Sequence, residues 1–394
     1  MSGLLDTADR SPYAFFEQVR AQGGVVWDAS VGGWLVVDHA LCKLVEGDEA
    51  HFTNPYVGAP PTIVAIKGGM GNITLTHGAA HDRLRRFHLK LLTPAAVEAY
   101  RRDIVVPVVA ACMAAIEGRG QAELFAELAA RVPPAVTLGL LGLDWRDDAL
   151  VARVLALHDD IMAFIGRNYA PELERSALEA SAAINAILLP AIRARRTGDG
   201  TDFISRIWRE APSDEAIDEQ TVLGICREIF LGGSDTTVYG IANCLYVLLT
   251  DADARAKLQA DRSHLRAFVD ETMRLYGSVQ YRYRIAAEAS EVGGVAVAAG
   301  DTLVLVNAAA NRDPAKYGCP AHFDLDRRPV TDHLAFNWGE RSCVGAGLAR
   351  AEMRECLLAV LDRLPDVRLD AEREPPRLQG LFMRAFKPLH ARFA

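Results

Sequence analysis

The chain has 394 residues, of which 50% are hydrophobic and 24% are charged, so it has enough apolar material for a large globular core. Its formal net charge of -8, with no block of like charge, argues against a nucleic-acid binder. Length alone would allow two or three domains, but no break in composition divides the sequence, and we therefore expect one large domain over residues 1–394.

Short strands are the first predicted elements. Residues 25–27 and 34–37 are apolar runs on either side of a Val31-Gly32-Gly33 turn, which is typical of two strands. Helical patterning then dominates and predicts helices over residues 94–117, 122–141, 146–166 and 172–196. A polar loop over residues 196–200 ends this region.

A long helix is predicted over residues 221–250, with Asp218 as its N-cap and Asp251 near its end. The remaining patterns predict a helix over 264–276, strands over 283–289, 295–297 and 302–306, an irregular stretch over 311–329, and an apolar helix over 348–364. The sequence therefore predicts a mainly α protein with small β-sheets (α+β).

The seven cysteines are odd in number, widely spaced and contain no C-x-x-C pair. This pattern argues against a disulfide framework or a structural zinc site and favours a reducing compartment. The first twenty residues are mixed and polar, without a secretion signal or a membrane anchor. We expect a cytoplasmic protein.

Cys343 lies in the turn-rich segment 336–345, just before the predicted apolar helix. A thiolate there would lie at the positive end of that helix and two residues from the cation of Arg341, and both effects favour ionised sulfur, which binds soft metals. Gly339 and Gly345 flank the thiol, where the backbone must turn sharply or approach a flat ligand. A buried core cysteine is the alternative interpretation.

The spacing F-x-x-G-x-R-x-C-x-G, from Phe336 to Gly345, resembles the haem-ligand loop of the cytochrome P-450 family, in its soluble bacterial form. The resemblance runs from about residue 24 to the C-terminus and is closest over residues 230–356. It implies the cytochrome P-450 fold, in which a long central helix and the cysteine loop enclose haem b (iron protoporphyrin IX). Cys343 would be the axial thiolate ligand of the iron.

The middle of the long predicted helix contains Gly232 and Gly233, each of which costs about 1 kcal/mol against alanine in a helix. Ser234, Asp235 and Thr236 follow, and such residues compete for backbone hydrogen bonds. Several local rules broken together indicate a functional site, with a simple helix crossing as the alternative. The segment resembles the oxygen-binding groove of cytochromes P-450. The resemblance implies that Thr236 hydrogen-bonds dioxygen and that Asp235 relays protons toward it.

Four further cations are candidates for binding the two propionates of haem, because arginine pairs with carboxylates through two hydrogen bonds. By the resemblance they are His81, Arg85, Arg284 and Arg341. Taken singly, each is as well explained by a solvated surface charge.

Glu271 and Arg274 share a helix face at spacing i, i+3. In the family this spacing marks a buried structural ion pair, joined by a third residue from the irregular stretch, where His322 stands at a position that is more often arginine. Two other positions depart from the family pattern. Asn337 replaces a glycine but tolerates left-handed backbone, and Ser278 replaces a proline common before Val279.

The positions that face substrate in the family are apolar here, which favours a hydrophobic ligand such as a terpenoid, steroid or aromatic compound. They are Ile63 and Ile66 in an expected mobile loop, Phe164, Leu231, Val279, Leu381 and Phe382. Lys67 and Arg167 lie near enough in sequence to leave a fatty-acid carboxylate open.

The resemblance implies a monomeric monooxygenase that uses O2, with electrons from NAD(P)H through a ferredoxin and a ferredoxin reductase. Arg86, Arg350 and Arg354 are candidates for the face that docks the ferredoxin, since complementary charge speeds encounter. A peroxide-driven or non-hydroxylating haem enzyme would share Cys343, but often lacks the pair Asp235-Thr236. A haem sensor or carrier is the non-enzyme alternative.

Overall fold

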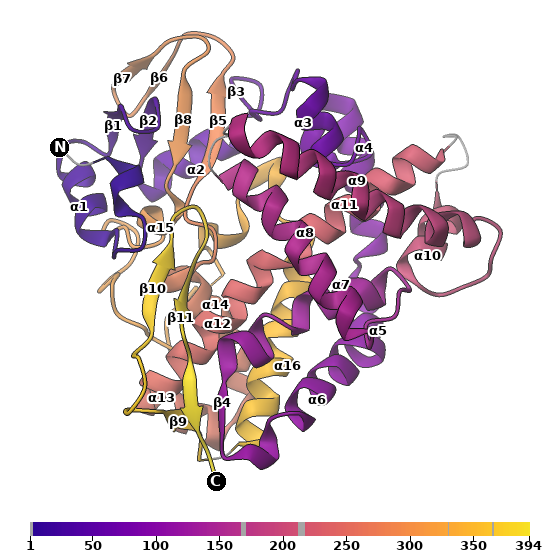
Figure 1. Cartoon of the computed structure of the whole chain (residues 1–394). Coiled ribbons are helices and arrows are strands. Elements are labelled where there is room, and N and C mark those ends of the chain that lie inside the picture. The colour runs from indigo at the N-terminus through magenta and orange to yellow at the C-terminus, as the bar shows by residue number, and fades with distance from the viewer. Residues whose placement is uncertain (1–2, 167–170, 212–216, 330, 365) are drawn as a thin grey trace.

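Helices form most of the molecule in the computed structural model, which describes residues 3–166, 171–211, 217–329, 331–364 and 366–394. In Figure 1 the helices fill one side, and the sheets gather on the other side with the N-terminal segment. The predicted mainly α architecture with small sheets is confirmed. The helices are α1 (Tyr13–Ala21), α2 (His39–Gly47), α3 (Pro61–Ile66), α4 (Gly78–Leu91), α5 (Pro94–Tyr100), α6 (Val106–Ala114), α7 (Val132–Leu140), α8 (Asp148–Gly166), α9 (Pro171–Ala194), α10 (Phe203–Glu210), α11 (Glu219–Gly233), α12 (Asp235–Thr250), α13 (Ala252–Ala260), α14 (Leu265–Tyr276), α15 (Asn307–Ala310) and α16 (Ala346–Arg363).

Four small sheets are present among the described residues. The largest has the order β1-β2-β8-β5-β3, with β2 and β8 parallel and the other neighbours antiparallel. The others pair β10 with β11, β6 with β7, and β12 with both β4 and β9. The strands are β1 (Val25–Asp28), β2 (Gly33–Val36), β3 (Phe52–Thr53), β4 (Gln121–Glu123), β5 (Arg282–Ala286), β6 (Ser290–Val292), β7 (Val295–Val297), β8 (Thr302–Leu305), β9 (Arg368–Leu369), β10 (Arg377–Gly380), β11 (Arg384–Lys387) and β12 (His390–Arg392).

The main hydrophobic core surrounds α12, which packs against α14, α16 and β11. Ile241, Leu245 and Leu248 of α12 are fully buried. Burial of apolar side chains supplies the main favourable free energy of such a core. Because this core holds α12 in place, it also fixes the junction between α11 and α12, where Gly232 and Gly233 lie.

The predicted continuous helix over residues 221–250 is wrong at one place. Helix α11 ends at Gly233, Ser234 has a non-helical backbone with ψ of -91°, and α12 begins at Asp235. The glycines and the hydroxyl and acidic side chains of this segment weaken helical hydrogen bonding, which explains a break at this point.

Two other predicted helices are also interrupted. Residues 94–117 form α5, a π-helical turn over Arg101–Val105 and α6, because Pro107 cannot donate a backbone hydrogen bond. Residues 122–141 begin with strand β4 and a π-helical turn over Phe125–Ala129, and α7 starts with prolines in its first turn. The helical periodicity of the sequence predicted these two helical regions but not the points at which the helices are interrupted.

The expected mobile loop over residues 61–66 is instead helix α3, which starts at Pro61, a favourable first helical residue. Arg227 of α11 is fully buried and donates hydrogen bonds to the carbonyl of Ile66 and to Ser181 and Asn185 of α9. Burial lowers the pKa of Arg227 to about 10. This cation therefore fastens α3 to both α9 and α11.

Among the described residues, one helix, α9, is long and apolar enough to cross a membrane by length and composition alone. It carries Glu172 and Glu174 in its first turn, and it packs against α8, α11 and α3. These contacts place it among the helices of the folded protein, and its composition is weak evidence for a membrane span.

Candidate functional site

A cavity of about 390 Å³ lies between the α11–α12 break, strand β5 and the loop that precedes α16. It brings together side chains that are far apart in the sequence. The predicted site residues that line it are His81, Arg85, Leu231, Gly232, Gly233, Thr236, Val279, Arg284, Phe336, Arg341, Cys343, Gly345 and Phe382.

The sulfur of Cys343 opens onto this cavity from the loop before α16. The amide of Cys343 donates to the carbonyl of Phe336 at 2.8 Å, and Asn337 adopts a positive φ of +59° with an extended ψ of -178°. Burial raises the pKa of the thiol, and this outweighs the backbone amide of Gly345 and the charge of Arg282, both of which lower the pKa. A bound metal ion would deprotonate the thiol outright.

Arg341 does not face the sulfur, contrary to the expectation from its place in the sequence. Its guanidinium forms an ion pair with Glu49 and donates to the carbonyl of Thr76. The charges of Arg282 and Arg350 lower the pKa of Cys343. Burial lowers the pKa of Arg85, and the charge of Cys343 opposes that shift. A separation of two residues along the chain does not determine the direction in which a long side chain such as that of Arg341 points.

The other predicted cations converge on the same side of the cavity. Arg85 donates to the carbonyl and the hydroxyl of Ser342 at 2.7 Å. Arg284 is buried, donates to the carbonyl of Tyr283, and has no ion-pair partner among the described residues. Burial lowers the pKa of Arg284, and burial together with the charge of Arg341 lowers the pKa of His81. Arg284, a buried cation without an ion-pair partner among the described residues, is suited to bind an anionic group of a ligand, whereas Nδ1 of His81 already lies 3.3 Å from a carboxylate oxygen of Asp82.

At the helix break, three successive carbonyls of α11 accept hydrogen bonds from side chains. Ser234 Oγ donates to Phe230, His158 Nε2 lies 3.2 Å from the carbonyl of Leu231, and Thr236 Oγ1 donates to Gly232 at 2.7 Å. A helix end that lacks amide donors needs such partners. A Cβ atom at Gly232 would meet no atom within 4 Å, so the helix backbone here is open to a ligand.

Ser278, which stands where the family often has proline, contributes to the same place. Its hydroxyl donates to the carbonyl of Thr236 at 2.6 Å. Ser278 is buried and lines the cavity beside Val279. The serine therefore links the segment before β5 to the first turn of α12.

Asp235 does not line the cavity, although Thr236 beside it does. A carboxylate oxygen of Asp235 lies 3.0 Å from Nδ1 of His158, a fully buried residue of α8. Burial lowers the pKa of His158, but the contact with Asp235, the carbonyl of Leu231 and the charge of Asp159 together raise it by more, so the net shift of this pKa is upward.

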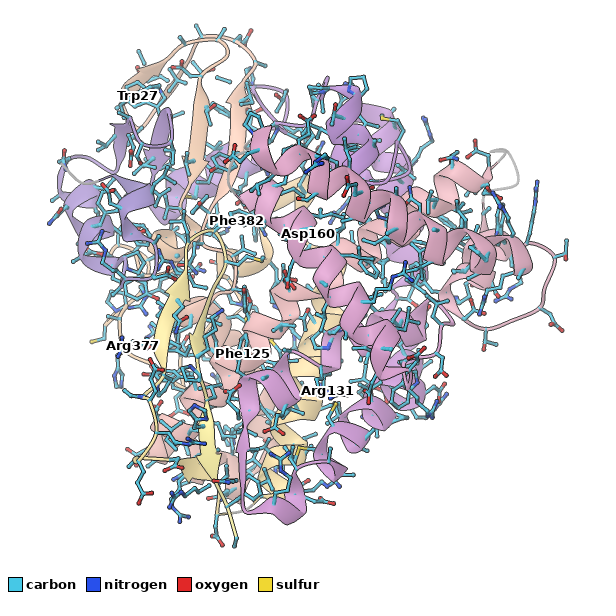
Figure 2. The ribbon with its side chains drawn as sticks, viewed as in Figure 1. Trp27, Phe125, Arg131, Asp160, Arg377 and Phe382 are labelled. Carbon is cyan, nitrogen blue, oxygen red and sulfur yellow. The ribbon has the colours of Figure 1, made fainter. Side chains whose placement is uncertain are left out.

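Only part of the predicted apolar wall faces the cavity. Leu231, Val279 and Phe382 line it, and Phe382 lies at the turn between β10 and β11 (Figure 2). Ile63, Ile66, Phe164 and Leu381 are not among its lining residues, and Ile66 and Phe164 are buried in the core instead. On α8 the cavity is lined by Met162 and Ile165, which lie with His158 on one helical face.

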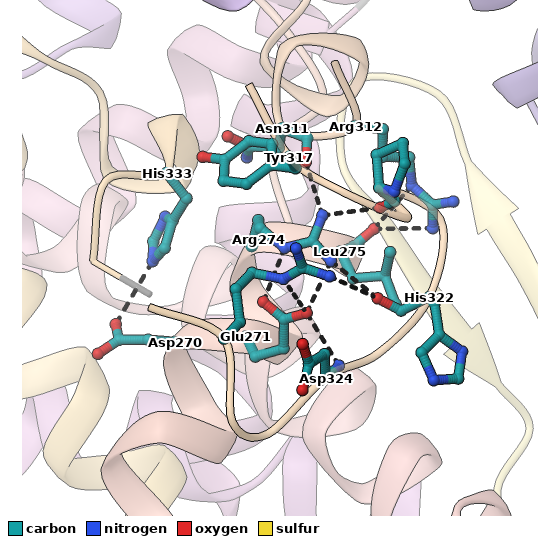
Figure 3. Close-up of polar contacts among 12 residues, drawn as sticks. Asp270, Glu271, Arg274, Leu275, Asn311, Arg312, Tyr317, His322, Asp324 and His333 are labelled. Atoms are coloured by element: carbon teal, nitrogen blue, oxygen red, sulfur yellow. Dashed lines mark hydrogen bonds and ion pairs between the residues drawn. The ribbon is translucent and has the colours of Figure 1, made fainter. Parts of the chain in front are cut away.

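Glu271 and Arg274 form the predicted buried pair, at the centre of the network in Figure 3. Both side chains are fully buried and are joined by two hydrogen bonds of 2.7 Å. Arg274 also donates to the carbonyls of Asn311, Pro320 and His322. The pair therefore fastens α14 to the irregular stretch before the cysteine loop.

The predicted third side chain of this network, His322, is wrong. His322 is exposed, its imidazole points away from Glu271 in Figure 3, and it contributes its backbone carbonyl. Arg327 takes the place instead, with Nε 3.0 Å from a carboxylate oxygen of Glu271. The irregular stretch folds back and brings a later arginine to the acid, which no periodic pattern could indicate.

Arg327→Gln should therefore lower the free energy of unfolding by about 1.5–3 kcal/mol, since a buried carboxylate loses a charged hydrogen-bond donor. His322→Gln should change it by no more than about 0.5 kcal/mol, because the carbonyl stays and the side chain is exposed. Urea unfolding of the two variants checks the assignment. Equal losses for both would contradict it.

Comparison with known proteins adds to this geometry. The family model described as Cytochrome P450 matches residues 152–391. The "Cytochrome P450 monooxygenase PikC" of Streptomyces venezuelae is 32% identical over 91% of this chain and 85% of its own length. The chain belongs to the cytochrome P450 family. Its predicted identity as a cytochrome P450 monooxygenase, an oxidoreductase, is thereby confirmed.

Other relatives and solved structures agree with this assignment. The "C-19 steroid 1alpha-hydroxylase" of Sorangium cellulosum is 26% identical over 96% of this chain and 95% of its own. A solved structure of P450BioI in complex with a fatty-acyl carrier protein has the same fold, with a TM-score of 0.88, 22% identity and coverage of 98% of this chain and 99% of that chain.

The cavity fits the haem that this family carries. A thiol forms one wall, the open backbone at Gly232 lies in the wall formed by α11, and buried cations such as Arg284 can pair with carboxylates. Arg282, which the sequence reasoning missed, is a further cation on the wall and donates to the side chain of Asn337 at 3.0 Å. It lies two residues before Arg284 on β5, and strand alternation places both on one face.

Proposed function

We propose that this cytochrome P450 hydroxylates a hydrophobic small molecule, such as a terpenoid, a steroid or an aromatic compound. The observation that carries the proposal is the apolar part of the cavity wall, where Leu231, Val279 and Phe382 meet Met162 and Ile165 of α8. Such a wall binds apolar ligands with few polar contacts. The names of two relatives, a steroid C26-monooxygenase and a C-19 steroid 1alpha-hydroxylase, support this class of substrate.

Cys343 would hold the iron of haem b through its thiolate, and the cations of the cavity would pair with the propionates. The side chains proposed for this role are those of His81, Arg85, Arg282, Arg284 and Arg341. The guanidinium of Arg341 also forms an ion pair with Glu49. When bound, the haem supplies the oxygen chemistry, and its thiolate ligand favours cleavage of the O–O bond. Phe336 and Gly345 shape the loop around the sulfur.

The protein's own residues bind substrate, exclude water and deliver protons. The hydroxyl of Thr236 lies on the cavity wall, where it can donate a hydrogen bond to dioxygen once it releases the carbonyl of Gly232. Asp235, beside it, relays the proton that replaces the one given up. Gly232, where a Cβ atom would meet nothing within 4 Å, leaves room for oxygen against the helix backbone, whereas a Cβ atom at Gly233 would lie 3.3 Å from Oγ1 of Thr137.

Electrons are proposed to come from NAD(P)H through a ferredoxin reductase and a ferredoxin. Arg86 and Arg354 are exposed and suited to dock an acidic partner. Arg350 is not, because its guanidinium is paired with buried Asp270 at 2.6 Å. We further propose a cytoplasmic monomer in which residues 1–394 act as one catalytic domain.

A screen of hydrophobic compounds for a spin-state shift of the ferric haem tests the proposed substrate class. Terpenoids, steroids or aromatic compounds should shift the haem to high spin, and the binder should be hydroxylated in the presence of NAD(P)H, a ferredoxin and its reductase. The screen should contain matched acids and alcohols, since Lys67 is buried on the cavity wall with its ammonium 4.0 Å from the Tyr56 ring. Arg167, the other cation considered, lies outside the described residues.

Two other outcomes would contradict the proposal. Full product yield with hydrogen peroxide alone, and none with the electron-transfer proteins, would show a peroxygenase. Tight binding without turnover by any donor would favour a sensor or carrier. The intact pair Asp235-Thr236 at the helix break favours oxygen-dependent turnover over both.

A further inference from the structure

Three titratable side chains meet behind the helix break, on the side of Asp235 that faces α8. His158 and Asp159 come from α8 and Asp235 from the start of α12, and their ligand-type atoms all lie within 4.8 Å of one another. His158 is fully buried, the side chain of Asp235 is 13% exposed, and Asp159 is exposed. The cluster therefore reaches from solvent to a buried imidazole.

The hydrogen bonds of His158 fix where its protons are. Nε2 faces the carbonyl of Leu231, and a carbonyl can only accept, so Nε2 must carry a hydrogen. Nδ1 lies 3.0 Å from Oδ2 of Asp235 and makes no aligned hydrogen bond with any described residue. A neutral imidazole protonated on Nε2 would direct a lone pair at a carboxylate lone pair, which is repulsive. The pair His158–Asp235 is therefore stable at this distance when it holds one further proton.

The surrounding charges favour that proton. Asp159 and Asp235 both raise the pKa of His158. Burial and the charge of Asp235 raise the pKa of Asp159, and the charge of His158 lowers it. To smaller extents, Asp160 raises this pKa and Lys387 of β11 lowers it. Tyr239 of α12 also faces this group, and burial raises its pKa to about 12, so it stays neutral.

We propose that Asp159, Asp235 and His158 form the route by which protons enter the cavity, with His158 as the positioning residue whose Nδ1 holds the transferable proton against the carboxylate of Asp235. This inference rests on the proposed monooxygenase function. Each hydroxylation takes up one dioxygen, two electrons and two protons, and releases one water. The route moves protons alone: the proton of the His158–Asp235 pair passes toward Thr236, and Asp159 replaces it from solvent.

The titration of His158 tests the pair without any turnover. In protein labelled with ¹⁵N-histidine, held in the diamagnetic ferrous–CO state, Nε2 of His158 should stay protonated while Nδ1 titrates with a pKa above the ordinary 6.5. In Asp235→Asn that pKa should fall to 6.5 or below, because burial then acts without the acid. An ordinary or lowered pKa in the wild type would overturn the shared proton.

The pH dependence of coupling tests the route. Peroxide released per NAD(P)H consumed should rise in the wild type as pH rises through the pKa of the pair, because the stored proton is then lost. His158→Gln should release about tenfold more peroxide at neutral pH and lose this pH step. Asp159→Asn, an exposed change that leaves the core intact, should increase the solvent isotope effect on product formation.

Asp160→Asn is the matched control, since Asp160 is the next residue on α8 and is not one of the three clustered side chains. It should behave as the wild type. If Asp159→Asn equals Asp160→Asn and His158→Gln keeps the wild-type pH step, the route is refuted. Lack of a thiolate haem spectrum in the wild type would instead refute the proposed function, and the two failures are thus distinguishable.

Discussion

Thr236→Ala is expected to leave the fold and the haem spectrum intact while it diverts reducing equivalents from product to hydrogen peroxide. The hydroxyl lies on the cavity wall and donates a hydrogen bond of 2.7 Å to the carbonyl of Gly232. Alanine therefore removes a hydrogen-bond donor without leaving a void in the hydrophobic core. Loss of a positioned proton donor typically costs about a hundredfold in the rate of the step that it serves. The amounts of hydrogen peroxide and of product formed per NAD(P)H consumed measure how the reducing equivalents are divided between the two.

Two further variants make this result specific. Thr236→Ser keeps the hydroxyl and should restore most of the coupling. Thr250→Ala removes the same kind of hydroxyl-to-carbonyl bond, from Thr250 to Tyr246, at the far end of the same helix. It should couple as the wild type does. Unchanged coupling in Thr236→Ala would remove Thr236 from proton delivery.

Glu271→Gln is expected to have the largest effect on stability. Glu271 and Arg274 are both fully buried, and glutamine leaves the guanidiniums of Arg274 and Arg327 without their carboxylate. Breaking a buried ion pair from one side costs about 3–5 kcal/mol. We therefore expect a large fall in the urea midpoint and in the fraction of purified protein that retains haem.

Glu98→Gln is the matched control for this prediction. Glu98 and Arg101 are also an i, i+3 pair, but the glutamate is mostly exposed. Its loss should change the urea midpoint little. Equal effects of the two substitutions would show that burial of Glu271 does not govern its contribution.

The sequence predicted the parts of the site that are written in short patterns. Each of these patterns spans only a few residues of the chain: the loop around Cys343, the segment from Gly232 to Thr236, and the pair Glu271–Arg274. The structure places the first two in the cavity wall and the third in a buried network. Positive φ at Asn337 was also predictable, because few residue types adopt it.

The features that the sequence missed depend on how elements are rotated and placed. His158 meets Asp235 across two helices, and no spacing along the chain records that contact. The sequence predicted that Phe164 of α8 faces the substrate, but the face of α8 that lines the cavity carries Met162 and Ile165. Which face lines the cavity depends on how the helix is rotated about its axis. Arg327 reaches Glu271 because an irregular segment folds back. These are tertiary facts, whereas periodicity is local.

One missed element did have a signal in the sequence. Helix α3 begins at Pro61 after Pro60, and proline favours the first helical turn. The break at Ser234 also had one, since the glycines and the hydroxyl and acidic side chains that suggested a functional site are the residues that weaken a helix.

The ferrous–CO spectrum of the purified protein tests the central claim, that Cys343 is the thiolate ligand of a haem. The wild type should show the strongly red-shifted Soret band of thiolate-ligated haem, and Cys343→Ser should lose it. Cys319→Ser, at an exposed cysteine outside the cavity, should keep it. A wild-type spectrum without the shifted band, or a Cys343→Ser protein that retains it, would contradict the account.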